Sequence, residues 1–217
     1  KVEAAYQAGL IQPDLIPVAL RGDAGYSMAT EDEGRRPETT MEGLAALKTP
    51  FRPHGKVTAG NASPLTDGAT VSAIASESFA RQMNLSIKMR MVSFGFAGVE
   101  PEVMGLGPIP STQKALDKAS LSIEDIGLFE LNEAFSVQVL SFLDHFGIDD
   151  EDPRVNPWGG AIALGHPLAA SGVRLMIQLA RQFEAHPEVR YGLTAMCVGL
   201  GQGGSVIWEN PHHKATK

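Results

Sequence analysis

Apolar and polar residues follow two different patterns along this 217-residue chain. Beyond about residue 85, short apolar runs rich in β-branched side chains alternate with segments whose apolar residues recur every three or four positions. The first pattern predicts buried strands and the second predicts helices. The predicted strands are 87–96, 126–131, 191–198 and 205–209, and the predicted helices are 108–118, 133–146 and 170–183. This order indicates an α/β sandwich with a largely parallel sheet, closed by an antiparallel hairpin at the glycine-rich segment 199–204.

Turn and cap signals support these boundaries. Pro108 stands in the first turn of its predicted helix, where its missing N–H costs nothing. The sequence Ser122-Ile123-Glu124-Asp125 resembles a capping box and predicts one short helical turn before the strand 126–131.

The first part of the chain, to about Gly55, is polar and irregular. Residues 1–6 have the pattern of the middle of an amphipathic helix, without a cap or a start methionine, so we expect further sequence before Lys1. The other predictions for residues 7–83 are a strand at 15–20, a flexible acidic stretch at 21–37, a helix at 40–47, a turn-rich segment at 61–68 and an Ala- and Ser-rich helix at 69–83.

Composition narrows the class of protein. Hydrophobic residues make up 43% of the chain, enough for a substantial core, and the net charge of −7 argues against nucleic-acid binding. No apolar run approaches the roughly 20 residues that a membrane span needs. A single cysteine excludes an internal disulfide and suits a reducing cytosol. We therefore expect a soluble, cytoplasmic chain with no membrane span and no nucleic-acid partner.

Neither a metal site nor a phosphate loop is predicted. No Cys/His spacing suits zinc, and His212-His213 lies in a polar tail. The glycine run 199–204 lacks the Lys-Ser/Thr that follows a phosphate-binding loop.

Asn132, in the string Asn132-Glu133-Ala134-Phe135, comes where an apolar strand ends and a helix is predicted to begin. Ligands of α/β sheets usually bind at that edge, where a primary amide can hold a water molecule or donate to a carbonyl oxygen. The alternative is that Asn132 only caps the following helix.

His166 stands between Gly165 and Pro167, which restrict the backbone, and a helix follows at once. A neutral imidazole there can donate from Nε2 to an oxyanion. The alternative is a structural histidine in a turn.

Cys197 ends a strand and precedes Val198-Gly199 and further glycines. Glycines let a ligand approach backbone N–H donors, and a thiol can carry a proton when its neighbours adjust its pKa. The alternative is a buried cysteine that acts as a small hydrophobic residue.

Taken together and in this order, the three strings resemble the C-terminal signatures of the thiolase family. Upstream, Arg36-Pro37-Glu38-Thr39-Thr40, Val57-Thr58-Ala59-Gly60-Asn61-Ala62-Ser63 and Asp67-Gly68-Ala69 are similar to the central region of that family. The resemblance implies the C-terminal half of a five-layered α-β-α-β-α sandwich with a mixed, mostly parallel sheet. It divides the chain into 1–55, a remnant of the family's loop region, and 56–217, the C-terminal half. The N-terminal half, with the nucleophilic cysteine, would be missing.

The resemblance also implies an activity, the CoA-dependent thiolytic cleavage of 3-ketoacyl-CoA in fatty-acid β-oxidation, a reversible Claisen condensation. Cys197 would be the acid/base at the enolate carbon, His166 would activate the nucleophile, and Asn132 would hold the water of an oxyanion hole. The Gly199 N–H would belong to a second oxyanion hole, and Phe135 would line the pocket. The chain alone would be inactive, with CoA or acyl-CoA as substrate and no permanent cofactor.

For CoA, the family resemblance points to Phe51, Ala59 and Ser63. Four nearby basic residues form a cluster that can attract nucleotide phosphates, with a solvated loop as the alternative: Lys48, Arg52, His54 and Lys56.

The chain departs from the family's usual sequence at one position of the His166 turn. Ala169 replaces the glycine that the family usually has after Gly165-His166-Pro167-Leu168, which puts the turn geometry and the acyl-chain preference in question.

The expected partners are the missing half, a second copy in a homodimer or homotetramer, and a β-oxidation multienzyme partner. The alternative functions are a non-catalytic CoA-binding or scaffold half and a condensing enzyme without thiolysis. Condensing enzymes commonly use His and Asn where this chain has His and Cys, so Cys197 favours a thiolase.

Overall fold

The computed structural model describes residues 1–214, so the last three residues of the predicted second domain lie outside the described residues. Its centre is a four-stranded sheet in the order β3-β6-β5-β4. The strands are β3 (Arg90–Gly98), β4 (Ile126–Leu131), β5 (Tyr191–Val198) and β6 (Gln202–Glu209). β4 and β5 cover the same residues as predicted, whereas β3 and β6 are shifted or extended by a few residues.

The sheet is mixed, as predicted, but the hairpin does not close it at an edge. β5 and β6 form the expected antiparallel hairpin, and β6 then pairs antiparallel with β3. Only β4 and β5 pair in parallel. Three strands therefore run in one direction, yet two of the three pairings are antiparallel, because the reversed strand β6 lies inside the sheet.

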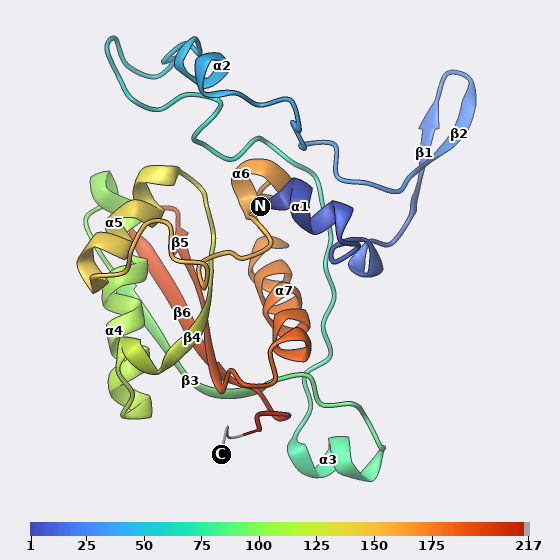
Figure 1. Cartoon of the computed structure of the whole chain (residues 1–217), viewed down its shortest axis with the longest axis vertical. Helices are drawn as coiled ribbons and strands as arrows, with labels where there is room; N and C mark the ends of the chain where they lie inside the picture. The colour runs from blue at the N-terminus through green and yellow to red at the C-terminus, as the bar shows by residue number, and fades with distance from the viewer. Residues whose placement is uncertain (215–217) are drawn as a thin grey trace.

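Helices cover both faces of the sheet (Figure 1). α4 (Pro108–Ala119) packs on β3 and β6, with α5 (Ser136–Phe146) beside it, and α7 (Ser171–Ala185) packs on β4 and β5 on the other face. The short helices η2 (Pro101–Leu106), η3 (Ile123–Asp125) and α6 (Ala161–Leu164) lie in the connections. The capping box of Ser122 and Asp125 is present, as predicted.

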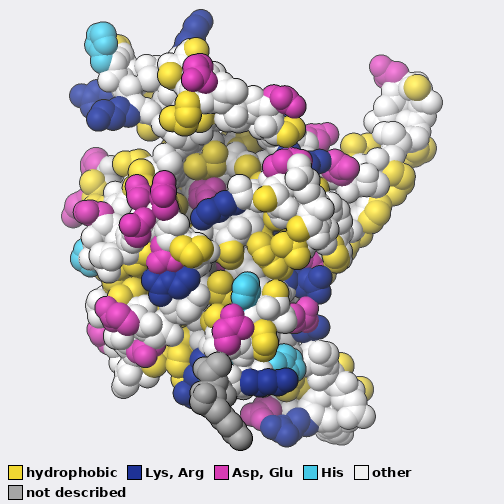
Figure 2. Space-filling view, in the orientation of Figure 1, with side chains coloured by type: hydrophobic (Ala, Val, Ile, Leu, Met, Phe, Trp, Pro, Cys, Tyr) yellow, Lys and Arg dark blue, Asp and Glu magenta, His cyan; other side chains and the backbone are white. Residues whose placement is uncertain are grey.

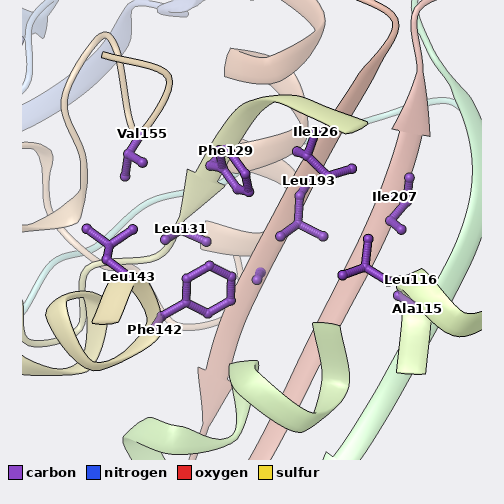
Figure 3. Close-up of a cluster of buried hydrophobic side chains, with 11 residues drawn as sticks. Ala115, Leu116, Ile126, Phe129, Leu131, Phe142, Leu143, Val155, Leu193 and Ile207 are labelled. Carbon is purple, nitrogen blue, oxygen red and sulfur yellow. The ribbon is translucent and has the colours of Figure 1, made fainter. Parts of the chain in front are cut away.

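The main core lies between the sheet and the helices α4 and α5 (Figure 3). Its buried side chains come from β4, β5 and β6, from both helices and from the loop residue Val155, and Phe129, Leu193 and Ile207 are fully buried. Each such side chain contributes about 1.5–3 kcal/mol relative to an exposed position. A second core, with Leu179, Phe183 and Trp208, lies under α7.

The N-terminal part consists of small elements on long connections (Figure 1). They are α1 (Val2–Gln7), η1 (Gln12–Asp14), β1 (Val18–Gly22), β2 (Gly25–Ala29), α2 (Met41–Ala45) and α3 (Glu77–Gln82). α1 docks on the rest of the chain, since Val2, Ala5 and Tyr6 form a buried cluster with Trp158 and Leu164. This contact anchors the start of the chain next to α6.

Two sequence predictions in this part are wrong. The stretch 21–37 was expected to be flexible, but β1 and β2 form an antiparallel hairpin with Gly22 opposite Gly25. The predicted helix 69–83 shrinks to α3, which Ser76 caps through the Phe79 N–H at 3.2 Å. Residues 69–76 are extended instead, because they have no buried face and because Thr70 Oγ1 donates to Ala170 O at 2.9 Å.

Candidate active site

Asn132 lies at the carboxyl end of β4 and is completely buried. Its backbone N–H donates to Ala195 O of β5 at 2.9 Å, which continues the parallel pairing by one residue. α5 begins only at Ser136, with Phe135 in the cap position, so the interpretation of Asn132 as a helix cap is wrong. Its amide Nδ2 lies 3.2 Å from His166 Nε2 instead. Two strings that are 34 residues apart thus meet through their polar side chains.

The conformation of the turn around Gly165 places His166. Gly165 has φ +103°, and a Cβ there would lie 2.5 Å from Thr66 Oγ1, so only glycine fits. The His166 N–H donates to that same Thr66 Oγ1 at 3.2 Å. The predicted constraint on the histidine therefore comes from a segment 100 residues earlier as well as from its neighbours.

Hydrogen bonds with Asn132 and Ser171 define the tautomer of His166. Ser171 Oγ is buried and donates to Pro167 O at 3.1 Å. Because Asn132 Nδ2 can only donate, the neutral ring accepts at Nε2 and carries its proton on Nδ1, which faces the lone pairs of Ser171 Oγ 2.6 Å away. Nε2 is left as the acceptor that faces the amide of Asn132. Nε2 of the neutral ring can therefore accept a proton, and it becomes a donor once it is protonated.

The surroundings of His166 favour the neutral imidazole. Burial lowers the pKa of His166 below its ordinary value, and the nearby Arg174 guanidinium lowers it further. A group with this pKa is neutral at pH 7 and can accept a proton at Nε2.

Cys197 is the next-to-last residue of β5 and is 5% exposed. Its Sγ lies 3.6 Å from Gln138 Oε1, and Gln138 Nε2 donates to Asn132 O at 2.9 Å. Burial raises the pKa of the Cys197 thiol, so the group is a protonated thiol at neutral pH. The thiol is therefore connected to Asn132 through one side chain.

Gly199 lies in the three-residue turn 199–201 between β5 and β6. A Cβ at Gly199 would meet no atom within 4 Å, so the space beside it is open. The next glycine differs, since Gly201 has φ +83° and a Cβ there would lie 2.1 Å from Val99 O. The turn thus needs Gly201 for its conformation and leaves Gly199 accessible.

Ser63 lies against the Asn132 string. The Ser63 N–H donates to Ala134 O at 3.0 Å, and the Ser136 N–H donates to Asn61 O at 2.9 Å. These bonds form an antiparallel bridge between Ala62 and Phe135. The structure thus brings the predicted substrate-binding residues Ser63 and Phe135 together next to Asn132.

Phe51 and Ala59 are exposed, and no hydrogen bond joins them to the three strings among the described residues. The loop 51–57 instead curls around a hollow of about 580 Å³ that includes Arg52, His54 and Lys56. Basic side chains gather in this upper part of the molecule, above the α/β sandwich (Figure 2). This loop therefore lies apart from the site around His166.

Ala169 fits its turn without strain. Its φ is not positive, and its side chain is exposed. The Ala170 N–H still closes the turn onto Pro167 O at 2.8 Å. The glycine that the family usually has here is therefore not required by the backbone of this chain.

Sequence reasoning missed three residues that hold this site: Gln138, Ser171 and Thr66. A signal existed for two of them. Gln138 precedes the buried Phe142 by four positions, and Ser171 precedes the buried Leu175 by four, so both are polar residues on the buried face of a predicted helix. Thr66 carries no such signal, because its role depends on a contact 100 residues away.

Two negative findings apply to residues 1–214. No group of three or more His, Cys, Asp or Glu side chains in this range is arranged to hold a metal ion. None of the described helices has the length and apolarity needed to cross a membrane.

Comparison with known proteins identifies related sequences along nearly the whole chain. The family model "Thiolase, C-terminal domain" matches residues 85–210, and "Thiolase, N-terminal domain" matches residues 1–78. The 3-oxoadipyl-CoA/3-oxo-5,6-dehydrosuberyl-CoA thiolase of Escherichia coli K12 is 48% identical over 94% of this chain and 51% of its own length. The 3-ketoacyl-CoA thiolase of Photobacterium profundum is 45% identical over 96% of this chain and 54% of its own length.

Solved structures of related enzymes superimpose on this chain. The acetyl-CoA acetyltransferase of Bacillus anthracis superimposes with a TM-score of 0.91 at 35% identity, over 96% of this chain and 52% of that one. Human mitochondrial 3-ketoacyl-CoA thiolase in complex with CoA gives a TM-score of 0.85 at 35% identity, over 96% of this chain and 51% of that one. The fold is therefore thiolase-like, as predicted.

The chain spans about half the length of the curated relatives it matches. The predicted division between residues 55 and 56 stays a prediction. Because one family model covers more than half of the chain and the three strings meet in one site, this chain belongs to the thiolase family.

Proposed function

We propose that this chain is the C-terminal part of an acyltransferase that cleaves 3-ketoacyl-CoA with a second CoA. The observation that carries the proposal is the contact of His166 Nε2 with Asn132 Nδ2 at 3.2 Å, beside a buried thiol linked to the same strand end. The reaction needs two thiols, and Cys197 is the only cysteine of the sequence. The proposal therefore includes a nucleophilic cysteine from outside these 217 residues, and residues 1–217 alone are proposed to be inactive.

The first step uses His166 as the base. Its Nε2 removes the proton of the nucleophilic thiol, and the thiolate attacks the keto carbon of the substrate. The bond between that carbon and its neighbour, carbon 2, then breaks. The electron pair of the broken bond passes to the acetyl-CoA enolate, and the shortened acyl group stays on the nucleophile as a thioester.

Cys197 completes the chemistry. Its S–H donates a proton to carbon 2 of the enolate, which gives acetyl-CoA and a Cys197 thiolate. That thiolate removes the proton of the incoming CoA thiol. CoA then attacks the thioester and leaves with the acyl group, and the nucleophile is expelled as a thiolate. His166 Nε2 returns its proton to that thiolate, so that both protein thiols and the imidazole are back in their starting state.

Two oxyanion holes are proposed. Protonated His166 Nε2 donates to the thioester oxygen of the enolate, and the Asn132 amide holds an ordered water as the second donor. The N–H of Gly199, beside open space, stabilises the tetrahedral intermediates of acyl transfer. One such donor typically lowers a barrier by about 3–4 kcal/mol.

The substrate-binding residues complete the proposal. Phe135 lines the acyl pocket, and Ser63 contacts the pantetheine chain of CoA next to it, since the two residues lie on paired segments. Phe51 and Ala59 contact the remainder of CoA, and the basic loop 51–57 attracts its phosphates. Because the loop 51–57 lies apart from the site around His166, the proposal requires a CoA molecule that extends from that loop to the site.

The setting of the enzyme belongs to the same proposal. We propose a cytoplasmic homodimer or homotetramer that works in fatty-acid β-oxidation, alone or with a multienzyme partner. The single buried, unpaired cysteine is compatible with a reducing compartment. Light scattering during size-exclusion chromatography of the active protein measures the oligomeric state.

The test is a chimera in which the N-terminal part of the E. coli relative precedes residue 1 of this chain. We expect the chimera to cleave a 3-ketoacyl-CoA by thiolysis. The decrease in the absorbance of the substrate's enolate form measures the rate. His166→Gln lowers kcat by about a thousandfold, because the base and one oxyanion donor are lost. The matched control His145→Gln changes an exposed histidine on α5 and leaves kcat unchanged.

Cys197→Ala separates the enzyme from the scaffold alternative. In the chimera this variant still accepts an acyl group from an acyl-CoA donor, detected by mass spectrometry, but does not cleave 3-ketoacyl-CoA. Unimpaired thiolysis in Cys197→Ala contradicts the assigned role. A folded chimera that binds CoA without any turnover supports the non-catalytic alternative.

A further inference from the structure

Gln138 contacts two of the three strings at once. It lies in the first turn of α5 and is 4% exposed. Its Nε2 donates to Asn132 O at 2.9 Å, and its Oε1 lies 3.6 Å from Cys197 Sγ. No other described side chain forms a hydrogen bond with the sulfur of Cys197.

The chemistry of these partners determines which way the amide points. Asn132 O is a carbonyl oxygen, which only accepts, so the NH₂ group of Gln138 must face it. The carbonyl oxygen of Gln138 therefore faces Cys197. Because this oxygen also only accepts, Cys197 must supply the proton of the contact as S–H.

Packing holds the side chain of Gln138 in this position. η2 lies over it, and a Cβ at Gly105 would lie 3.1 Å from Gln138 Cβ and 3.3 Å from Cγ. Glycine at position 105 thus makes room for the glutamine. The Gln138 N–H is satisfied by Phe135 O at 3.2 Å, so the helix start does not compete for the amide.

We propose that Gln138 is a positioning residue for Cys197: it fixes the direction of the S–H bond and links the thiol to the strand end that presents Asn132. The inference rests on the proposed function, in which Cys197 delivers a proton to carbon 2 of the substrate. A hydrogen bond accepted from the thiol stabilises the protonated form, which is the form needed for that delivery. Loss of the acceptor leaves the thiol free to rotate inside the site.

Infrared spectroscopy of the S–H stretch tests this contact directly. Cys197 is the only cysteine, so the chain has a single S–H band. We expect Gln138→Met, which keeps the side-chain length, to shift the band to higher frequency because the acceptor is lost. Gln113→Met is the matched control, since Gln113 is exposed on α4 and bonds only to Asp117 among the described residues. It leaves the band in place.

Gln138→Glu provides a rescue that a purely structural role does not predict. A protonated carboxyl group can donate to Asn132 O and accept from Cys197, as the amide does. At low pH we therefore expect the wild-type band, and at higher pH, where the carboxylate cannot donate, a changed one. An S–H band that is the same in wild type, Gln138→Met and Gln138→Glu at all pH values overturns the inference. Circular dichroism and a thermal melt confirm that each variant is folded.

Activity of the chimera separates this inference from the proposed function. Gln138→Met lowers kcat of thiolysis by about tenfold with little change in KM, as expected for one hydrogen bond at the reacting group. If the chimera with unchanged Gln138 has no thiolysis, the proposed function fails and the S–H band decides the contact alone. If that chimera is active and Gln138→Met keeps its kcat, only the inference on Gln138 fails.

Discussion

Residues 90–210 and residues 12–85 differ in how much of their apolar surface they bury. In the first region Leu193 and Ile207 are 0% exposed, whereas in the second Leu65 and Ile74 are 105% and 88% exposed. Figure 1 shows the same contrast, with a layered sandwich on one side and separate small elements on long connections on the other. Contiguous exposed apolar residues mark interaction surfaces. The C-terminal region thus buries its own core, and the earlier region presents apolar groups that this chain does not cover.

The two regions are nevertheless joined at the site. The segment 61–70 bridges Phe135, bonds to His166 and bonds to Ala170. The site therefore stands where the region with a core meets the region without one. The C-terminal region thus carries the proposed catalytic side chains, and residues 61–70 contact the backbone next to them.

The largest expected effect comes from the contrast in burial. Leu193→Ala removes a fully buried side chain from the main core and lowers the free energy of unfolding by about 2–5 kcal/mol. Leu65→Ala makes the same chemical change at a fully exposed position and changes it by less than about 0.5 kcal/mol. Urea denaturation of both variants measures the difference. Equal destabilisation contradicts the division into the two regions.

A smaller effect follows from the buried carboxyl group of Glu130. Burial raises its pKa to about 7, against the opposing influence of Arg174. In the unfolded chain the Glu130 carboxyl group has its ordinary pKa of about 4.3. Between that value and pH 7 it is therefore ionised in the unfolded state and still protonated in the native state. Stability therefore falls as pH rises through this window, by up to about 1.4 kcal/mol per pH unit, and is constant above it.

Glu130→Gln tests that sign. The neutral amide keeps a polar group opposite Gln182, whose Nε2 donates to Glu130 Oε1 at 2.7 Å. We expect the stability difference between variant and wild type to grow in favour of the variant from pH 4.5 to 7. Glu124→Gln changes an exposed residue and serves as control. Parallel pH profiles for wild type and Glu130→Gln contradict the raised pKa.

The smallest effect concerns the contact between the two regions. Thr66→Val removes the acceptor of the His166 N–H and lowers the free energy of unfolding by about 1 kcal/mol. In the active chimera it also lowers kcat, because the turn that holds His166 loosens. Thr39→Val is the control, since the Thr39 hydroxyl donates only to Arg36 O within its own turn. A Thr66 variant as active and stable as the Thr39 variant shows that residues 61–70 do not position the histidine.

Sequence periodicity predicted the elements of the C-terminal region well. The strands 126–131 and 191–198 appear over the predicted residues, and the helices 108–118, 133–146 and 170–183 appear with shifts of one to three residues at most ends. These segments succeed because each has one face that this same chain buries. In the N-terminal region the prediction failed at 69–83, where no buried face supports the helical propensity, and at 21–37, where the strands β1 and β2 pair although their residues are mostly exposed.

The amino-acid sequence by itself determined the residue types of the site and their places at strand ends and turns: Asn132, His166 and Cys197. Only the tertiary structure decided that β6 lies inside the sheet, that Gln138 joins Cys197 to Asn132, and that Ser171 and Thr66 hold His166. The reason is physical. Periodicity reports which face of a segment is buried, whereas strand order and hydrogen-bond partners depend on contacts between residues far apart in the chain.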